Sequence, residues 1–268
     1  MIEGLIVSLI LMAVAGLVIG VIAALLGIGG GMLMVPALFF IFVLLKVPLD
    51  ARMHVAAGTS LFVMIATSVG SVYSHWRQKN VVWPLTYRVL PGIAVGVIVG
   101  ALLAASLKSS TLAIIFAIVL VGIAALMVFG FKATPSKRDR PGFFVGSACG
   151  SVIGFKSGLL GVGGGALSVP WLTWLGLPQN EVSGTSSTFT FPAAVIGTVA
   201  FMLTGIDSLN LDYTIGYVFW PALPVAGTAS ICGTLIGARL ARRVPGRTLR
   251  VIFGVILFGV SISMFVAR

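Results

Sequence analysis

Two glycine-rich segments carry the residues of this chain that are best suited to bind a small ligand. Residues 27–31 read Gly-Ile-Gly-Gly-Gly and residues 161–165 read Gly-Val-Gly-Gly-Gly, and a short apolar stretch that contains a proline follows each of them. Glycine leaves backbone N–H groups uncovered, and a helix that starts beyond such a turn has a positive N-terminus, so both features favour an anion. Close packing of helices is the alternative reason for a triple glycine. The candidate ligands in these turns are Gly27, Gly29, Gly30, Gly31, Gly161, Gly163, Gly164 and Gly165.

Hydroxyl side chains recur in a second pair of segments. Gly-Thr-Ser stands at residues 58–60 and again at 184–186, where six hydroxyl residues fall within residues 183–190. Hydroxyl groups in membrane helices often bond to their own backbone or join neighbouring helices, and we expect this role for about half of them. The residues that recur in both copies are the better candidates to bind an anion: Thr59, Ser60, Thr185 and Ser186.

Lys156 is the one charged residue that lies well inside an apolar segment, five residues before Gly161. A charge within the membrane is a functional candidate, since burying it costs roughly 2.5–3.5 kcal/mol on insertion scales. An ammonium group beside the second glycine turn would attract an anion. The alternative is that the side chain snorkels to the membrane surface. Ile22 takes its place in the first half of the chain.

All six acidic residues lie at the termini or in loops, so we expect no carboxylate at mid-membrane to bind a cation. No paired His and Glu, no Ser, His and Asp set and no nucleotide-binding loop of the GxxxxGK type is present. These observations predict no catalytic residues, no metal and no cofactor, and they favour an anion as the substrate.

The elements that must position these residues are membrane helices. Apolar residues make up 59% of the 268 residues and charged residues 9%, against about 25% charged in a soluble domain, which excludes a soluble enzyme, a nucleic-acid binder and a disordered protein. The predicted fold class is an all-α polytopic membrane protein with about ten segments. They cover residues 5–26, 32–45, 55–74, 81–106, 111–131, 143–160, 166–176, 182–204, 214–238 and 248–267. Glycines at four-residue spacing, at 92–100 and 146–158, predict close helix packing.

The chain repeats itself. Residues 27–36 and 161–170 are identical at seven of ten positions at an offset of 134, Gly-Thr-Ser recurs at an offset of 126, and Gly100, Thr111, Phe116 and Gly122 recur at an offset of 137. We therefore predict a first membrane repeat at residues 1–131, a cytoplasmic linker at 132–142 and a second membrane repeat at 143–268. Each repeat opens with a glycine-hinged helical hairpin, because the segments after the glycines are too short to span the membrane comfortably.

The charge pattern predicts that the two repeats are inverted. The net charge of +11 comes from 17 basic and 6 acidic residues, and basic residues gather in cytoplasmic loops. Residues 75–80, 132–142 and 239–250 are basic, whereas 205–213, the counterpart of 75–80, carries two aspartates and no basic residue. Equivalent loops on opposite sides of the membrane imply inverted repeats with both termini outside, the architecture of secondary transporters. A parallel arrangement is the alternative.

The doubled Gly-x-Gly-Gly-Gly-x-Leu-x-Val-Pro, followed in each half by Gly-Thr-Ser, resembles the TauE/SafE family of sulfite and organosulfonate exporters, over the whole chain. The resemblance implies that the motif positions in both halves form the central site, and it implies export of a small sulfur-containing anion across the inner membrane. Lys156 is not part of the motif, so its role rests on its position alone.

The predicted function is a secondary transporter that exports sulfite or organosulfonates by alternating access. Its partners are this anion and the lipid bilayer, with no nucleic acid; the sequence leaves the oligomeric state open. An anion channel with the same hairpins is the first alternative, and a membrane-embedded enzyme is the second.

Overall fold

The computed structural model describes residues 2–26, 30–129, 141–206, 211–240 and 246–267. Within these residues, six helices (α1, α3, α4, α5, α6 and α8) are long and apolar enough to cross a membrane. The prediction of an all-α polytopic membrane protein is therefore confirmed. The helices are α1 (Ile2–Leu26), α2 (Gly31–Leu44), α3 (Leu49–Arg77), α4 (Trp83–Ser106), α5 (Ser109–Phe129), α6 (Phe143–Leu160), α7 (Gly165–Trp174), α8 (Gln179–Gly205), α9 (Thr228–Leu240) and α10 (Gly246–Val266).

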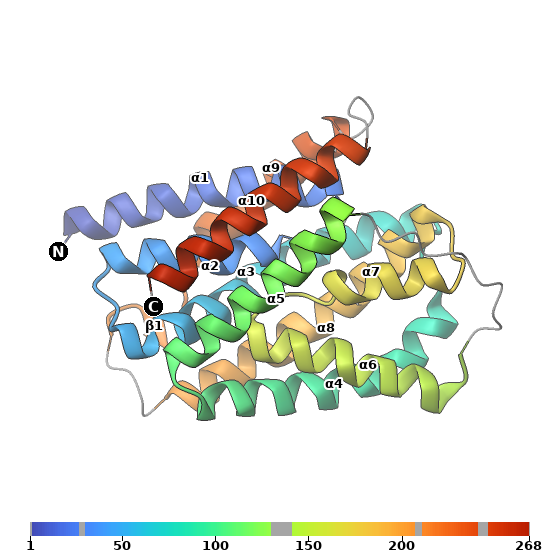
Figure 1. Ribbon diagram of the computed structural model, residues 1–268, viewed down its shortest axis with the longest axis horizontal. Coiled ribbons are helices and arrows are strands. Elements are labelled where there is room, and N and C mark those ends of the chain that lie inside the picture. Colours follow the sequence, from blue (N-terminus) through green and yellow to red (C-terminus); the bar gives the residue numbers. More distant parts are fainter. Residues whose placement is uncertain (1, 27–29, 130–140, 207–210, 241–245, 268) are drawn as a thin grey trace.

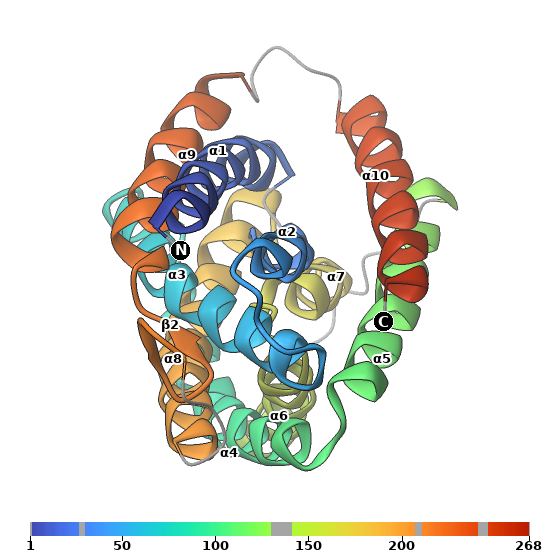
Figure 2. The same ribbon diagram turned by 90° about the vertical axis from the view of Figure 1, so that its left-hand side faces the viewer.

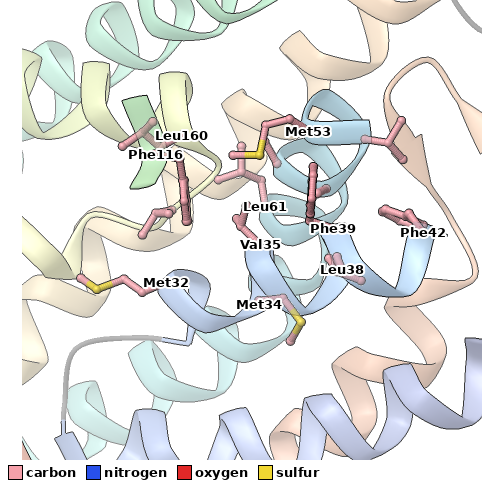
Figure 3. Close-up of a cluster of buried hydrophobic side chains, with 14 of the residues drawn as sticks. Met32, Met34, Val35, Leu38, Phe39, Phe42, Met53, Leu61, Phe116 and Leu160 are labelled. Atoms are coloured by element: carbon pink, nitrogen blue, oxygen red, sulfur yellow. The ribbon is translucent and has the colours of Figure 1, made fainter. Parts of the chain in front are cut away.

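The helices run roughly along the long axis of the molecule, and both chain ends lie at the same end of it (Figure 1). Viewed along that axis, the short helices α2 and α7 lie in the centre, and the longer helices surround them (Figure 2). Figure 1 shows that they follow one another along the axis. The central position explains the composition of α2, which is apolar on every face. Val35, Leu38 and Phe39 of this helix are at most 1% exposed and pack with Leu61 and Met53 of α3 (Figure 3).

The two halves exchange helices. The first helix of each half packs along the fourth helix of the other half, so that α1 lies against α9 and α6 lies against α4. Gly20 of α1 meets the carbonyl group of Ser230, and Gly154 of α6 meets the carbonyl group of Ile93, so neither position has room for a side chain. The two contacts are equivalent, because the repeat offset of 134 relates Gly20 to Gly154 and the offset of 137 relates Ile93 to Ser230. The glycines at 92–100 and 146–158 line the same interface, which confirms their packing role.

Equivalent helices run in opposite directions. Gly58, in the first part of α3, packs against Phe201 near the end of α8 and against the carbonyl group of Tyr217. Gly184, in the first part of α8, packs against the carbonyl group of Asn80 just beyond the end of α3. Figure 1 shows the same reversal for α5 and α10. Inverted repeats require this antiparallel relation. The division into repeats at residues 131 and 143 stays a prediction, and most of the predicted linker lies outside the described residues.

The predicted apolar segment at 214–238 is interrupted. Two short strands, β1 (Thr214–Ile215) and β2 (Val218–Phe219), form an antiparallel hairpin, and a π-helical turn (Leu223–Gly227) precedes α9. Gly216 has a positive φ of 56°, and Pro221 and Pro224 have no N–H group to donate to a helix. The prediction of one continuous segment was therefore wrong here.

Helices α3 and α8 begin earlier than predicted, at Leu49 and Gln179 instead of residues 55 and 182. Each starts directly after a proline and carries an acidic residue in its first turn, Asp50 or Glu181. A proline before the helix and a carboxylate at its positive end are start signals that the hydropathy pattern alone does not show.

Candidate anion site at the meeting of two helix N-termini

The first turns of α2 and α7 touch in the middle of the molecule. A methyl group added at Gly31 would lie 3.1 Å from the backbone nitrogen of Gly163. The two glycine turns are therefore so close that a side chain at position 31 would be crowded against the second turn. The N-caps are Gly30 and Gly164, and no described side chain caps the first turn of either helix. Because the first N–H groups of a helix have no partner within it, two uncapped positive ends meet at this point.

The junction lies at mid-depth in the helix bundle. Met64, near the middle of α3, contacts the positions of both Gly31 and Gly163, and Thr190, near the middle of α8, contacts the position of Gly163. The short helices also fit this depth: α2 has 14 residues and α7 has 10, or about 21 Å and 15 Å, less than the roughly 30 Å of hydrocarbon. Both short helices therefore begin inside the bundle and are too short to cross the hydrocarbon on their own.

Lys156 reaches the junction from α6. Its ammonium group donates a 3.1 Å hydrogen bond to the carbonyl oxygen of Gly163, and the side chain is only 9% exposed. No ion pair joins it to a carboxylate within the described part of the chain. The structure thus places a buried lysine amino group at the second glycine turn, and the snorkelling alternative does not describe this geometry.

The threonines of the two Gly-Thr-Ser copies contact the opposite half of the chain. The hydroxyl oxygen of Thr59 accepts a hydrogen bond from the N–H of Phe219 (3.0 Å), and that of Thr185 accepts one from the N–H of Val82 (3.1 Å). Both threonines are fully buried. Each hydroxyl keeps its own proton to donate, so a role as anion ligand stays a prediction for both residues.

The serines of the two copies differ. Ser186 pairs with Ser168 of α7 through a 2.6 Å hydrogen bond between their hydroxyl groups. Ser60 is fully buried, and its hydroxyl has no hydrogen-bond partner among the residues that the structure describes. The counterpart of Ser168 in the first half is Met34, which has no hydroxyl to offer. Ser60 is therefore a buried polar group that the described part of the fold leaves unsatisfied, which is unusual in a folded protein.

The remaining predicted glycines lie in or beside the turns. Gly161 ends α6 in a left-handed conformation with φ of 70° and packs against Ala57 of α3. Gly30 packs against Ile19 of its own hairpin, and Gly164 packs against the equivalent Ile153. Gly165 is the first residue of α7 and is buried. Gly27 and Gly29 lie outside the described residues.

The structure adds Met64, Thr190 and Ser168 to the predicted set. Met64 and Thr190 occupy equivalent positions at the offset of 126. The repeat in the sequence could therefore have identified these two residues as an equivalent pair. Within the described residues, no group of three or more His, Cys, Asp or Glu side chains comes together to hold a metal ion. The chemistry that this set offers is that of hydrogen-bond donors, which include the amino group of Lys156.

A polytopic bundle with antiparallel equivalent helices, and with two short helices whose N-termini meet at mid-depth, has the architecture of a membrane transporter. The sequence matches the family described as "Sulfite exporter TauE/SafE" over residues 12–264, and the chain belongs to this family. It is therefore a TauE/SafE family membrane transporter.

Three relatives illustrate the range of similar proteins. A probable membrane transporter protein of Haemophilus influenzae is 30% identical over 261 residues, which cover 96% of this chain and 98% of the relative. A probable membrane transporter protein of Methanocaldococcus jannaschii is 28% identical, with 92% and 91% covered. The probable membrane transporter protein YunE of Bacillus subtilis is 27% identical, with 93% and 94% covered.

Proposed function

We propose that this protein carries small sulfur-containing oxyanions, such as sulfite or an organosulfonate, out of the cell across the cytoplasmic membrane by alternating access. The observation that carries the proposal is the meeting of the uncapped N-termini of α2 and α7 beside the buried ammonium group of Lys156. Three positive features converge there, with no carboxylate among the described residues paired to the cation. An oxyanion would accept hydrogen bonds from all three.

The proposed ligands are the backbone N–H groups of both glycine turns, the ammonium group of Lys156, and the hydroxyl groups of Ser60, Ser186 and the two equivalent threonines. Ser60 supports this set because its hydroxyl is buried and has no partner in the described part of the chain. Donors that are mostly neutral hold an anion without neutralising it fully, and a carrier must also release what it binds. The name of the family supports sulfite and related anions as the substrate class.

Alternating access would come from one repeat rocking against the other around the junction. The antiparallel relation of α3 and α8 supports this mechanism. Gly58 and Gly184 make equivalent contacts at opposite ends of the bundle, so the two ends are built alike and could open in turn. We place the end with Arg77 and Lys79 in the cytoplasm by the positive-inside rule, with both termini outside. The rocking units are the proposed repeats 1–131 and 143–268.

Flux into liposomes tests the proposal. Purified protein is reconstituted, and uptake of sulfite, thiosulfate, sulfate and sulfoacetate is followed with chloride as the comparison anion. We expect saturable uptake of at least one sulfur oxyanion, and faster uptake when the same anion is present inside, which is the behaviour of a carrier. Unsaturable flux with unitary currents would replace the carrier with a channel, and chemical conversion of the anion would identify an enzyme. Flux of none of these sulfur anions would overturn the proposed substrate class.

A further inference from the structure

The thioether of Met64 fills the space between the two glycine turns. A methyl group added at Gly31 would lie 2.6 Å from the sulfur of Met64 and 3.3 Å from its terminal methyl, and one added at Gly163 would collide with that terminal methyl. Met64 is 3% exposed, so the side chain is enclosed there. An apolar group thus sits against two helix N-termini, where hydrogen-bond acceptors would be favoured.

The equivalent residue of the second half has a different character. Thr190 also borders this space, since a methyl group added at Gly163 would lie 2.8 Å from its Cγ2 atom. Its hydroxyl donates a 3.2 Å hydrogen bond to the carbonyl oxygen of Ser186 one turn earlier, which restrains the side chain. Methionine is unbranched and has three rotatable side-chain bonds, so Met64 is the adaptable member of the pair.

We propose that Met64 occupies the anion space when no anion is bound, and that the room its side chain vacates sets the size of the anion that the protein accepts. An entering anion displaces the thioether, takes the hydrogen bonds of the two helix N-termini, and leaves the backbone of the turns in place. A three-oxygen anion needs little displacement, whereas a tetrahedral anion or a sulfonate with a carbon chain needs more. The role of Met64 rests on the proposed function of the junction as an anion site.

Two substitutions separate size from flexibility. Met64→Ala removes the thioether and opens the space, so we expect the uptake ratio of sulfoacetate to sulfite to rise at least tenfold. Met64→Leu keeps nearly the same volume with a branched and stiffer side chain, so we expect slower uptake of every anion without that rise in the ratio. Met264→Ala is the matched control, because Met264 is equally buried but lies on α10, which packs against α5.

Elution as a single species and thermal unfolding establish that each variant is folded. If Met64→Ala does not fold, Met64→Thr takes its place, since threonine already stands at the equivalent position 190, and the same rise in the ratio is expected. An unchanged uptake ratio of sulfoacetate to sulfite in Met64→Ala (or Met64→Thr), together with wild-type uptake rates for Met64→Leu, would overturn the role of Met64. Flux of a sulfur anion through the wild-type protein would still support the anion site in that case. Absence of sulfur-anion flux in the wild-type protein would instead overturn the proposed function.

Discussion

The hydroxyl oxygen of Thr59 accepts a 3.0 Å hydrogen bond from the backbone N–H of Phe219, a residue of the opposite half of the chain. The equivalent bond joins Thr185 to the N–H of Val82, at the offsets of 126 and 137. Val82 is the N-cap of α4, so its N–H has no helical partner. The Gly-Thr-Ser copies therefore join the two halves at two equivalent points.

Loss of one such bond should destabilise the fold. Thr59→Val keeps the shape of the side chain but leaves the buried N–H of Phe219 without an acceptor, which costs about 1–3 kcal/mol. We expect a lower midpoint of thermal unfolding in detergent for this variant and for Thr185→Val. Thr59→Ser retains a hydroxyl and serves as the control. A Thr59→Val protein that unfolds at the wild-type temperature would show that the bond contributes nothing.

A side chain at the crossing of α6 and α4 should separate these helices. Gly154→Ala places a methyl group against the backbone of Ile93, where no flexible side chain can move aside. Gly122→Ala on α5 is the matched control, because no atom of the described residues lies within 4 Å of the added methyl group. We expect a lower unfolding midpoint for the first variant. The control should be neutral or stabilised by up to about 1 kcal/mol, since alanine favours a helix over glycine. Equal midpoints for both variants would contradict the close packing.

Removal of the cation at the junction should weaken anion binding. Lys156→Ile introduces the residue that stands at the equivalent position 22, and it deletes one charged hydrogen bond, worth about 1.5–3 kcal/mol or roughly 10- to 150-fold in affinity. The affinity is measured as the sulfite concentration that half-saturates uptake into liposomes. Lys108→Gln, at an exposed position between α4 and α5, is the control for loss of charge alone. Wild-type affinity in Lys156→Ile would remove the lysine from the site.

The proposed orientation is testable with single cysteines in a protein that lacks Cys149 and Cys232. Gln78 follows α3, and Asp212 precedes β1 at the other end of the bundle. We expect a membrane-impermeant thiol reagent to label Asp212→Cys in intact cells, and to label Gln78→Cys only after the membrane is opened. Labelling of both from one side would rule out the inverted arrangement.

The repeat in the sequence predicted much of this structure because both copies kept their glycines. Gly20 and Gly154 match in the sequence at the offset of 134, and they make equivalent helix contacts in the structure. The hairpins with short second arms followed from segment length in the same way. The β1–β2 hairpin was missed because Val218 and Phe219 raise the hydropathy of a segment that Pro221 and Gly216 break.

The site was harder to predict, because the sequence does not show which side chains meet across the halves. Glycine turns and Lys156 are visible as types and spacings, but the contact of Met64 with Gly31 and Gly163 exists only in the folded protein. Thr59 and Thr185 were selected for their recurrence, which reflects equivalent packing contacts as readily as equivalent ligands. Symmetry in a duplicated chain identifies structural positions first.

The exchange of helices between the halves has a consequence for synthesis of the protein. Gly16 and Gly20 of α1 pack against Ala226 and Ser230, which the ribosome adds more than 200 residues later. Helix α1 is synthesised long before its partner α9. Until α9 is present, the glycine face of α1 contacts lipid or the insertion machinery instead. Native packing of α1 can therefore be completed only near the end of translation, after α9 has been synthesised.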